Sequence, residues 1–175
     1  GQSEAMLLAE HLGSDLGKTA MEVEKLALVT QEGANITADT IQRYVGISKE
    51  YNIFELQKAI GARDHLKAQR IAHYFGSDPK DHPLVLTVSL LTGWFSKVAM
   101  LHGMAGRPDG EVAATLKIPP FFVKEYAQAA QNFSKHAVVR AQTVLRETDL
   151  RSKGIGSASA DDGDLLREAI ARILS

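Results

Sequence analysis

The sequence contains no cysteine among its 175 residues. This absence excludes disulfide frameworks, iron–sulfur clusters, Cys-ligated zinc and thiol nucleophiles, and it fits a reducing compartment. A net charge is almost absent as well, because 20 Lys and Arg against 21 Asp and Glu leave -1 at pH 7. No field of one sign therefore draws the whole chain onto nucleic acid or an anionic membrane, so any such contact must be local.

Long hydrophobic runs are also missing. Thr, Ser, Gly or a charge interrupts the apolar stretches before they reach the ~18 residues of a membrane span, so we expect no transmembrane helix. The composition, 45% hydrophobic and 23% charged, is that of a globular protein with a sizeable core. The chain begins at Gly1 rather than Met and shows no signal peptide, which indicates a piece of a longer protein.

Apolar residues recur at spacings of three and four nearly everywhere, while alternation of period two is missing, which predicts an all-α fold. The stretch from Pro83 to about Met104 is apolar on more than half of its circumference, as expected for the central helix of a bundle. With their flanking caps and stops, the expected helices cover 4–12, 15–30, 37–45, 52–61, 64–76, 83–104, 110–117, 120–132, 134–153 and 161–175.

The helix over 15–30 is expected to bury one stripe formed by Leu16, Ala20, Val23 and Ala27. Gly46 is a natural helix stop, and we expect a domain boundary after it. The predicted organisation is a three-helix domain over 1–46 and a helical bundle over 47–175, with no internal repeat.

Patterns that would mark an enzyme or a bound cofactor are incomplete. Residues 13–19, GSDLGKT, have three residues between the glycines where a phosphate-binding loop needs four, so they predict a helix end followed by a helix start. The six His form no HExxH pattern, and Asp161, Asp162 and Asp164 lack the Glu that a calcium loop requires, since position 172 is Arg. We therefore predict no catalytic residues, no metal site and no cofactor.

The segment from Glu111 to Tyr126 resembles a helix-turn-helix, with Ala113 and Val123 ten residues apart around a turn. Its second helix would begin with two prolines, Phe121 and Phe122, where DNA-reading helices carry Arg, Asn, Gln or Ser. Packing is the favoured interpretation. A helix-turn-helix DNA-binding protein stays open as an alternative, followed by a helical regulatory domain of unknown ligand.

The helix after Ser134 is the one locally basic element. Its cations could contact nucleic acid or a partner, or they could form a solvated face with partial intrahelical pairing through Glu147 and Asp149, which is the favoured interpretation. The candidate contact residues are Arg140, Arg146, Arg151 and Lys153, with Lys135 at the start of the helix.

Four strings in register carry a family resemblance. They are LGSDLGKTAMEVEKLAL (12–28), ITADTIQRYVG (36–46), YNIFELQKAIGARD (51–64) and RAQTVLRETDLRSKG (140–154). In their order and spacing the sequence resembles the delta subunit of the bacterial DNA polymerase III clamp loader. The resemblance implies that 1–46 is the three-helix AAA+-type lid and 47–175 the collar, which is the oligomerisation domain of a subunit that helps to open and load the sliding clamp.

The same resemblance implies a lost nucleotide sensor. ATP-binding clamp-loader subunits carry Gly-Ser-x-Arg in the lid, whereas here Gly13, Ser14 and Asp15 precede Leu16. An uncharged side chain cannot stabilise charge on a phosphate, and we expect Leu16 to be part of the lid core instead. The resemblance implies that the delta subunit is moved by its neighbours and is not itself an ATPase.

Partners and location follow from the resemblance. It implies a collar that binds the other clamp-loader subunits, delta-prime and gamma/tau, and a sliding clamp held by an N-terminal domain outside this sequence. DNA contact is expected to be weak and non-specific, membrane contact is not expected, and the location is the bacterial cytoplasm. Trp94, Phe121 and Phe122 are expected in collar packing or an interface, whereas residues 1–46 are expected to lack apolar area to spare for partners.

Overall fold

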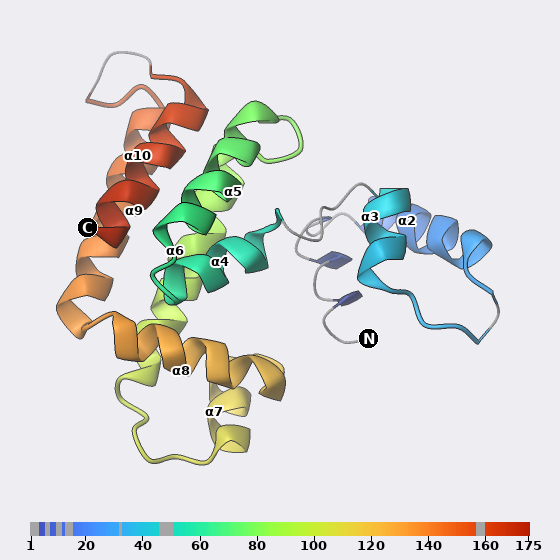
Figure 1. Cartoon of the computed structure of the whole chain (residues 1–175), viewed down its shortest axis with the longest axis horizontal. Helices are drawn as coiled ribbons and strands as arrows, with labels where there is room; N and C mark the ends of the chain where they lie inside the picture. Colours follow the sequence, from blue (N-terminus) through green and yellow to red (C-terminus); the bar gives the residue numbers. More distant parts are fainter. Residues whose placement is uncertain are drawn as a thin grey trace. The chain divides into compact units, whose positions relative to one another are not determined.

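The computed structural model describes residues 4–5, 8–9, 12, 16–31, 33–45, 51–156 and 160–175. All regular structure in these ranges is helical, which confirms the all-α prediction (Figure 1). The chain divides into two compact units, residues 1–54 and 55–175. This division lies after the predicted boundary at residue 46, and the lid and collar assignments of the two parts stay predictions.

The first unit contains α2 (Leu16–Val29) and α3 (Ala38–Val45). Its core consists of Leu8, Leu12, Leu26 and Ile41, with Ile36, Val45 and Phe54 packed against it. Thr37 caps α3 as predicted, because its hydroxyl accepts a hydrogen bond from the Thr40 amide at 3.2 Å. The predicted helix stop at Gly46 and the loop 13–15 lie outside the described residues.

The predicted core stripe of α2 is wrong. Leu16 is 83% exposed, and Ala20, Val23 and Ala27 are exposed as well. The inward stripe instead runs through Leu26, with Glu22 and Thr30 half-buried one turn before and after it. Apolar residues occupy several sides of α2, and so small a unit can cover only one of them. The expectation that this part has little apolar surface to spare therefore fails too.

The second unit contains seven α-helices and one 3-10 turn within the described residues (Figure 1). In chain order they are α4 (Ile53–Gly61), α5 (His65–Ser77), α6 (Leu84–Leu101), α7 (Asp109–Leu116), η1 (Pro120–Phe122), α8 (Val123–Asn132), α9 (Lys135–Ser152) and α10 (Asp162–Leu174). The division between units places the first two residues of α4 with the first unit.

Helix α6 lies at the centre of the second unit, as its apolar content predicts. It packs against α7, α8, α9 and α10, and it buries Trp94, Phe95 and Val98. With 18 residues and a mean hydropathy of 1.7 it is long and apolar enough to pass as a membrane span, which corrects the expectation that no stretch would. A core helix passes the same test, and packing against four neighbours accounts for the seven buried residues of α6, whereas one face of the helix stays exposed.

Side-chain caps begin three helices at the predicted positions. Asp64 accepts from the Lys67 amide at 3.0 Å before α5, and Ser134 accepts from the Ala137 amide at 3.2 Å before α9. Asp161 accepts from the Gly163 amide at 2.9 Å before α10, so these carboxylates and hydroxyls satisfy amides that have no partner within their helices.

Two glycines set the spacing between α5 and α10. A Cβ added to Gly76 would lie 2.7 Å from the Cα of Gly163, and one added to Gly163 would lie 2.9 Å from the Cα of Gly76. Real Cβ atoms do not approach backbone so closely, so any other residue at either position would force the helices apart.

Arg63 lies in the turn between α4 and α5 and contacts two helix ends, those of α8 and α10. Its Nε donates to the Asn132 carbonyl at 3.1 Å, and its Nη1 donates to the Leu174 carbonyl at 3.1 Å. The guanidinium carbon lies 4.6 Å from the centre of the Phe133 ring. The carbonyls belong to the last residues of α8 and α10, where a cation interacts favourably with the helix dipole. The backbone of Arg63 has a positive φ of 55°, which side-chain-bearing residues seldom adopt.

We predict that Arg63→Met lowers the free energy of unfolding by about 2 kcal/mol, because two helix C-termini lose their charged donor. Arg63→Lys keeps the charge and should lose less. Urea unfolding measures the change. The control is Arg107→Met, which removes only an exposed ion pair with Glu111 at 2.6 Å and should cost at most about 0.5 kcal/mol. Equal losses in Arg63→Met and the control would contradict this role.

Candidate functional site

The predicted contact residues of α9 do not form one basic patch. Arg140 and Arg146 are exposed, and neither takes part in an ion pair between described residues. Six residues separate them, which places them about 120° apart around the helix, on different edges. Arg151 and Lys153, at the far end of α9, are both engaged by acids.

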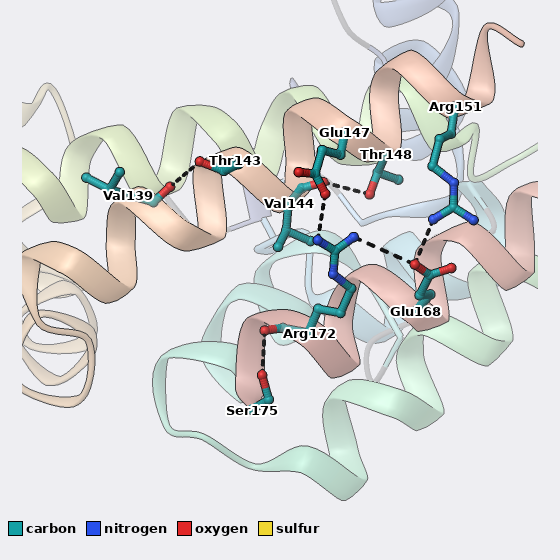
Figure 2. A network of polar contacts seen from close by, with 9 residues as sticks. All are labelled: Val139, Thr143, Val144, Glu147, Thr148, Arg151, Glu168, Arg172 and Ser175. Carbon is teal, nitrogen blue, oxygen red and sulfur yellow. Dashed lines mark hydrogen bonds and ion pairs between the residues drawn. The ribbon is translucent and has the colours of Figure 1, made fainter. Parts of the chain in front are cut away.

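The acid that engages Arg151 is Glu168 of α10 (Figure 2). Arg151 donates to Glu168 at 2.7 Å, and Arg172 donates to Glu147 at 2.6 Å while lying 3.7 Å from Glu168. The four side chains alternate in sign and link α9 to α10 across their shared surface. Their charges cancel, so this surface offers little net attraction for phosphate.

Intrahelical pairing occurs at one of the two expected positions. Lys153 donates to Asp149 at 2.6 Å, four residues away, whereas the expected pair between Arg146 and Asp149 does not form. Arg146 therefore keeps an uncompensated charge.

The hydrogen bond from Arg151 is the main reason why the pKa of Glu168 lies below its ordinary value, and Arg172 adds to the effect. The same hydrogen bond raises the pKa of Arg151. Both groups are thus held in their charged forms, and the network is complete wherever Glu168 is ionised.

We predict that the free energy of unfolding of the Glu168→Gln variant lies below that of the parent chain at pH 7. This difference should shrink as the pH falls. Since the folded-state pKa of Glu168 is depressed, its contribution is present above the unfolded-state value of about 4.3 and is lost as the pH falls through the folded-state value. Urea midpoints should therefore be lower in the variant at pH 7 and should converge with those of the parent chain as the pH falls through the folded-state pKa of Glu168. A difference that stays constant over this range would contradict the assignment.

The candidate aromatic residues fall into two environments. Trp94 is 5% exposed, with its ring 4.8 Å from that of Phe95 and 6.0 Å from that of Tyr126, so it lies in the core of the second unit. Phe121 and Phe122 belong to η1, where their ring centres lie 4.4 Å apart and Phe121 is 48% exposed. Phe121 thus offers apolar surface to solvent, whereas Trp94 does not.

The geometry of the helix-turn-helix segment does not favour DNA reading. Helix α7 ends at Leu116 and α8 begins at Val123, with η1 between them. The first turn of α8 contains buried Val123 and the acid Glu125, which lies 3.5 Å from Lys58. The exposed side chain of this turn is Lys124, and a single Lys offers a phosphate contact without reading bases.

Cofactor and metal candidates gain no geometric support. Within the part of the chain that the structure describes, no three His, Asp or Glu side chains come together as a metal site would require. Asp161 caps α10 instead. Leu16, the position of the missing sensor Arg, is exposed rather than part of the core as expected, because the core of the first unit takes Leu26 from α2. The glycines before Leu16 lie outside the described residues.

Two features that the sequence did not single out become visible in the structure. One is Arg63, whose contacts lie about 70 and 110 residues away along the chain, so no local pattern predicts them. The other is the outward face of α6. Its signal was available, since Lys97 is the only charged residue among the 18 of this helix, yet the same composition predicts a fully buried helix.

Comparisons with known proteins agree with the fold. Residues 50–159 match the family described as the C-terminal domain of the DNA polymerase III delta subunit. Curated protein sequences contain no match. Among solved structures, the Bacillus subtilis DNA clamp loader delta protein (YqeN) superposes with a TM-score of 0.63 over 99% of this chain, at 23% sequence identity. This chain covers 50% of that protein. Since the family match spans more than half of the sequence, the chain belongs to the DNA polymerase III delta subunit family, through its C-terminal domain.

Proposed function

We propose that this chain is the non-catalytic assembly portion of a clamp-loader delta subunit. One observation carries the proposal: the family match over 50–159 falls almost entirely within the compact helical unit 55–175. The matched segment is therefore a folded body with its own core, as an oligomerisation domain must be. Residues 47–175 would be the collar and residues 1–46 the lid.

The partners of this collar are the other clamp-loader subunits, delta-prime and gamma/tau. In a ring of unlike subunits each collar presents two different faces to two neighbours, so its contacts are heterologous. Opening and loading of the sliding clamp belongs to the whole delta subunit, in which the clamp is held by a domain beyond this sequence. The chain spans about half of the clamp-loader protein that it resembles in fold. This coverage supports the proposal that one part of the delta subunit assembles with its neighbours and another part holds the clamp.

The chemistry of the residues at hand supports a role without catalysis. Leu16 stands where the resemblance places the sensor Arg of ATP-binding subunits, and its exposed aliphatic side chain offers no charge to a nucleotide. This portion therefore passes on conformational changes that its ATP-binding neighbours drive, and it does not hydrolyse ATP itself. Its place of action is the bacterial cytoplasm, where the replisome assembles.

We predict that the full chain is monomeric or weakly self-associating alone and forms a hetero-complex with the collars of delta-prime and gamma/tau. Sedimentation velocity distinguishes the two states, and the complex should contain one copy of this chain, because one heterologous collar occupies one ring position. Stable closed homo-oligomers, or no complex with any of these subunits at micromolar concentration, would contradict the proposed function.

DNA binding is predicted to be weak, independent of sequence and dominated by Arg140 and Arg146, the exposed Arg residues of α9, which form no ion pair between described residues. Replacing both with Gln should abolish most of the binding measured by fluorescence anisotropy at 50 mM salt. Arg151→Gln should change it little, because Glu168 already neutralises Arg151. Binding that persists above about 200 mM salt, or that discriminates between duplex sequences, would support the helix-turn-helix alternative instead.

A further inference from the structure

The fully exposed residues of α6 carry no charge, and the only charged residue of the helix, Lys97, is half-buried at the edge of the same face, one turn after Gly93. The exposed residues of the helix are Val85, Leu86, Ser89, Thr92, Gly93, Ala99 and Met100. Val85 is 50% exposed and Met100 is 49% exposed, and they lie near opposite ends of the same face. A helix face that only meets water normally carries charged side chains, so this face differs from a solvated one.

The hydroxyl groups of Thr92 and Ser96 on this face turn back to their own helix, whereas Ser89 makes no such bond. Thr92 Oγ1 donates to the Val88 carbonyl at 2.8 Å, and Ser96 Oγ donates to the Thr92 carbonyl at 2.8 Å. Their donors are thus satisfied within α6, and a partner that covers them would leave no donor unpaired. For binding purposes the surface is more apolar than its sequence suggests.

The middle of the face is shallow enough for close approach. Gly93 has open space where a Cβ would stand, and Ser89 lies one turn before it. Small residues at this spacing form a groove that lets the ridge of another helix come near the backbone of α6. Val85 and Met100 stand at the two ends of this groove and supply apolar contact area.

A cationic rim borders the groove along α9. Gln142 donates to Ser96 at 3.2 Å, which fixes the edge of α9 that adjoins the outward face of α6. Arg146 lies four residues after Gln142 and Lys135 seven before it, so both share this edge. Neither forms an ion pair between described residues, and the nearby acid Asp149 is taken by Lys153.

We propose that this surface, the α6–α9 face of Val85, Ser89, Gly93, Met100 and Arg146, binds one helix of a neighbouring clamp-loader subunit. The helix it fits has an apolar stripe over the groove and Asp or Glu along the flank that meets Arg146 and Lys135. This inference rests on the proposed function and names the surface that serves it. A second copy of this chain fits poorly, because the face offers no free carboxylate to oppose its own cations.

The test measures the affinity of the full chain for the reconstituted set of the other clamp-loader subunits. Gly93→Glu places bulk and negative charge in the groove and should weaken binding at least about tenfold. It should leave the thermal midpoint unchanged or higher, because Gly is the poorer helix former. Arg146→Glu should weaken binding by a similar factor at 50 mM salt and less at 500 mM salt. The matched control is Gly110→Glu on α7, an equally open glycine that should change the affinity less than twofold.

The outcomes distinguish a failure of the proposed binding surface from a failure of the proposed function. Tight binding by the parent chain with no loss in Gly93→Glu would overturn the surface and leave the proposed function standing. Failure of the parent chain to bind would overturn both. Dimerisation of the free chain that Gly93→Glu abolishes would identify a second copy of the chain as the occupant of this surface. Binding to phosphatidylglycerol vesicles that Gly93→Glu abolishes would identify a lipid surface as the occupant. Either result would also overturn the proposal.

Discussion

The second unit depends on how closely α10 can approach α5. Gly76 and Gly163 bring the two backbones together where no side chain fits, and the rest of α10 follows from this contact. Once α10 lies there, Leu165, Leu166, Ile170 and Ile173 are buried along its length. Its carbonyl at Leu174 then lies within reach of Arg63, and its Glu168 and Arg172 meet α9. The close contact with α5 thus determines the position of α10, and α10 in turn pairs with α9 at the edge of the bundle.

The two sides of α9 have different charge balance as a consequence. On the side of α10, Arg151 and Glu147 are matched by Glu168 and Arg172, so that side is closed and nearly neutral (Figure 2). On the side of the outward face of α6, Arg146 has no acid within the described part of the protein to pair with. A surface that is apolar in its middle and charged at its rim is the usual anatomy of a protein interface. The acids of α9 and α10 thus pair with cations on one side, and the other side keeps the cation that the proposed neighbour would meet.

Local chemistry explains which parts of this fold could be predicted from the sequence. The caps Asp64, Ser134 and Asp161 act on amides two or three residues away, so their positions are visible in sequence. The buried residues of α5, which are Ala68, Ile71, Ala72 and Phe75, recur at spacings of three and four, the pattern of a helix buried on one face. The stripe of α2 was predicted on the wrong side, since Leu16 and Val23 share one face of the helix, Leu26 lies on another, and only the tertiary fold selects Leu26.

The candidate site was less predictable because its properties arise between distant segments. The pairing of Arg151 with Glu168 and of Glu147 with Arg172 removes charge that the sequence of α9 alone displays. The close approach of Gly76 and Gly163 and the contacts of Arg63 are likewise invisible in any short window. The sequence indicated the family through strings in register, whereas the face that fits a partner needed the packing of α6 and α9.

The most direct measurement of the central claim is a cryo-electron microscopy structure of the reconstituted clamp loader that contains this chain. The account predicts that residues 55–175 keep the bundle described here and meet a neighbouring subunit in the collar ring. A helix of that neighbour should lie along Gly93, with an acidic side chain within about 4 Å of Arg146. A map in which the outward face of α6 is open to solvent while the chain is bound elsewhere would contradict the account.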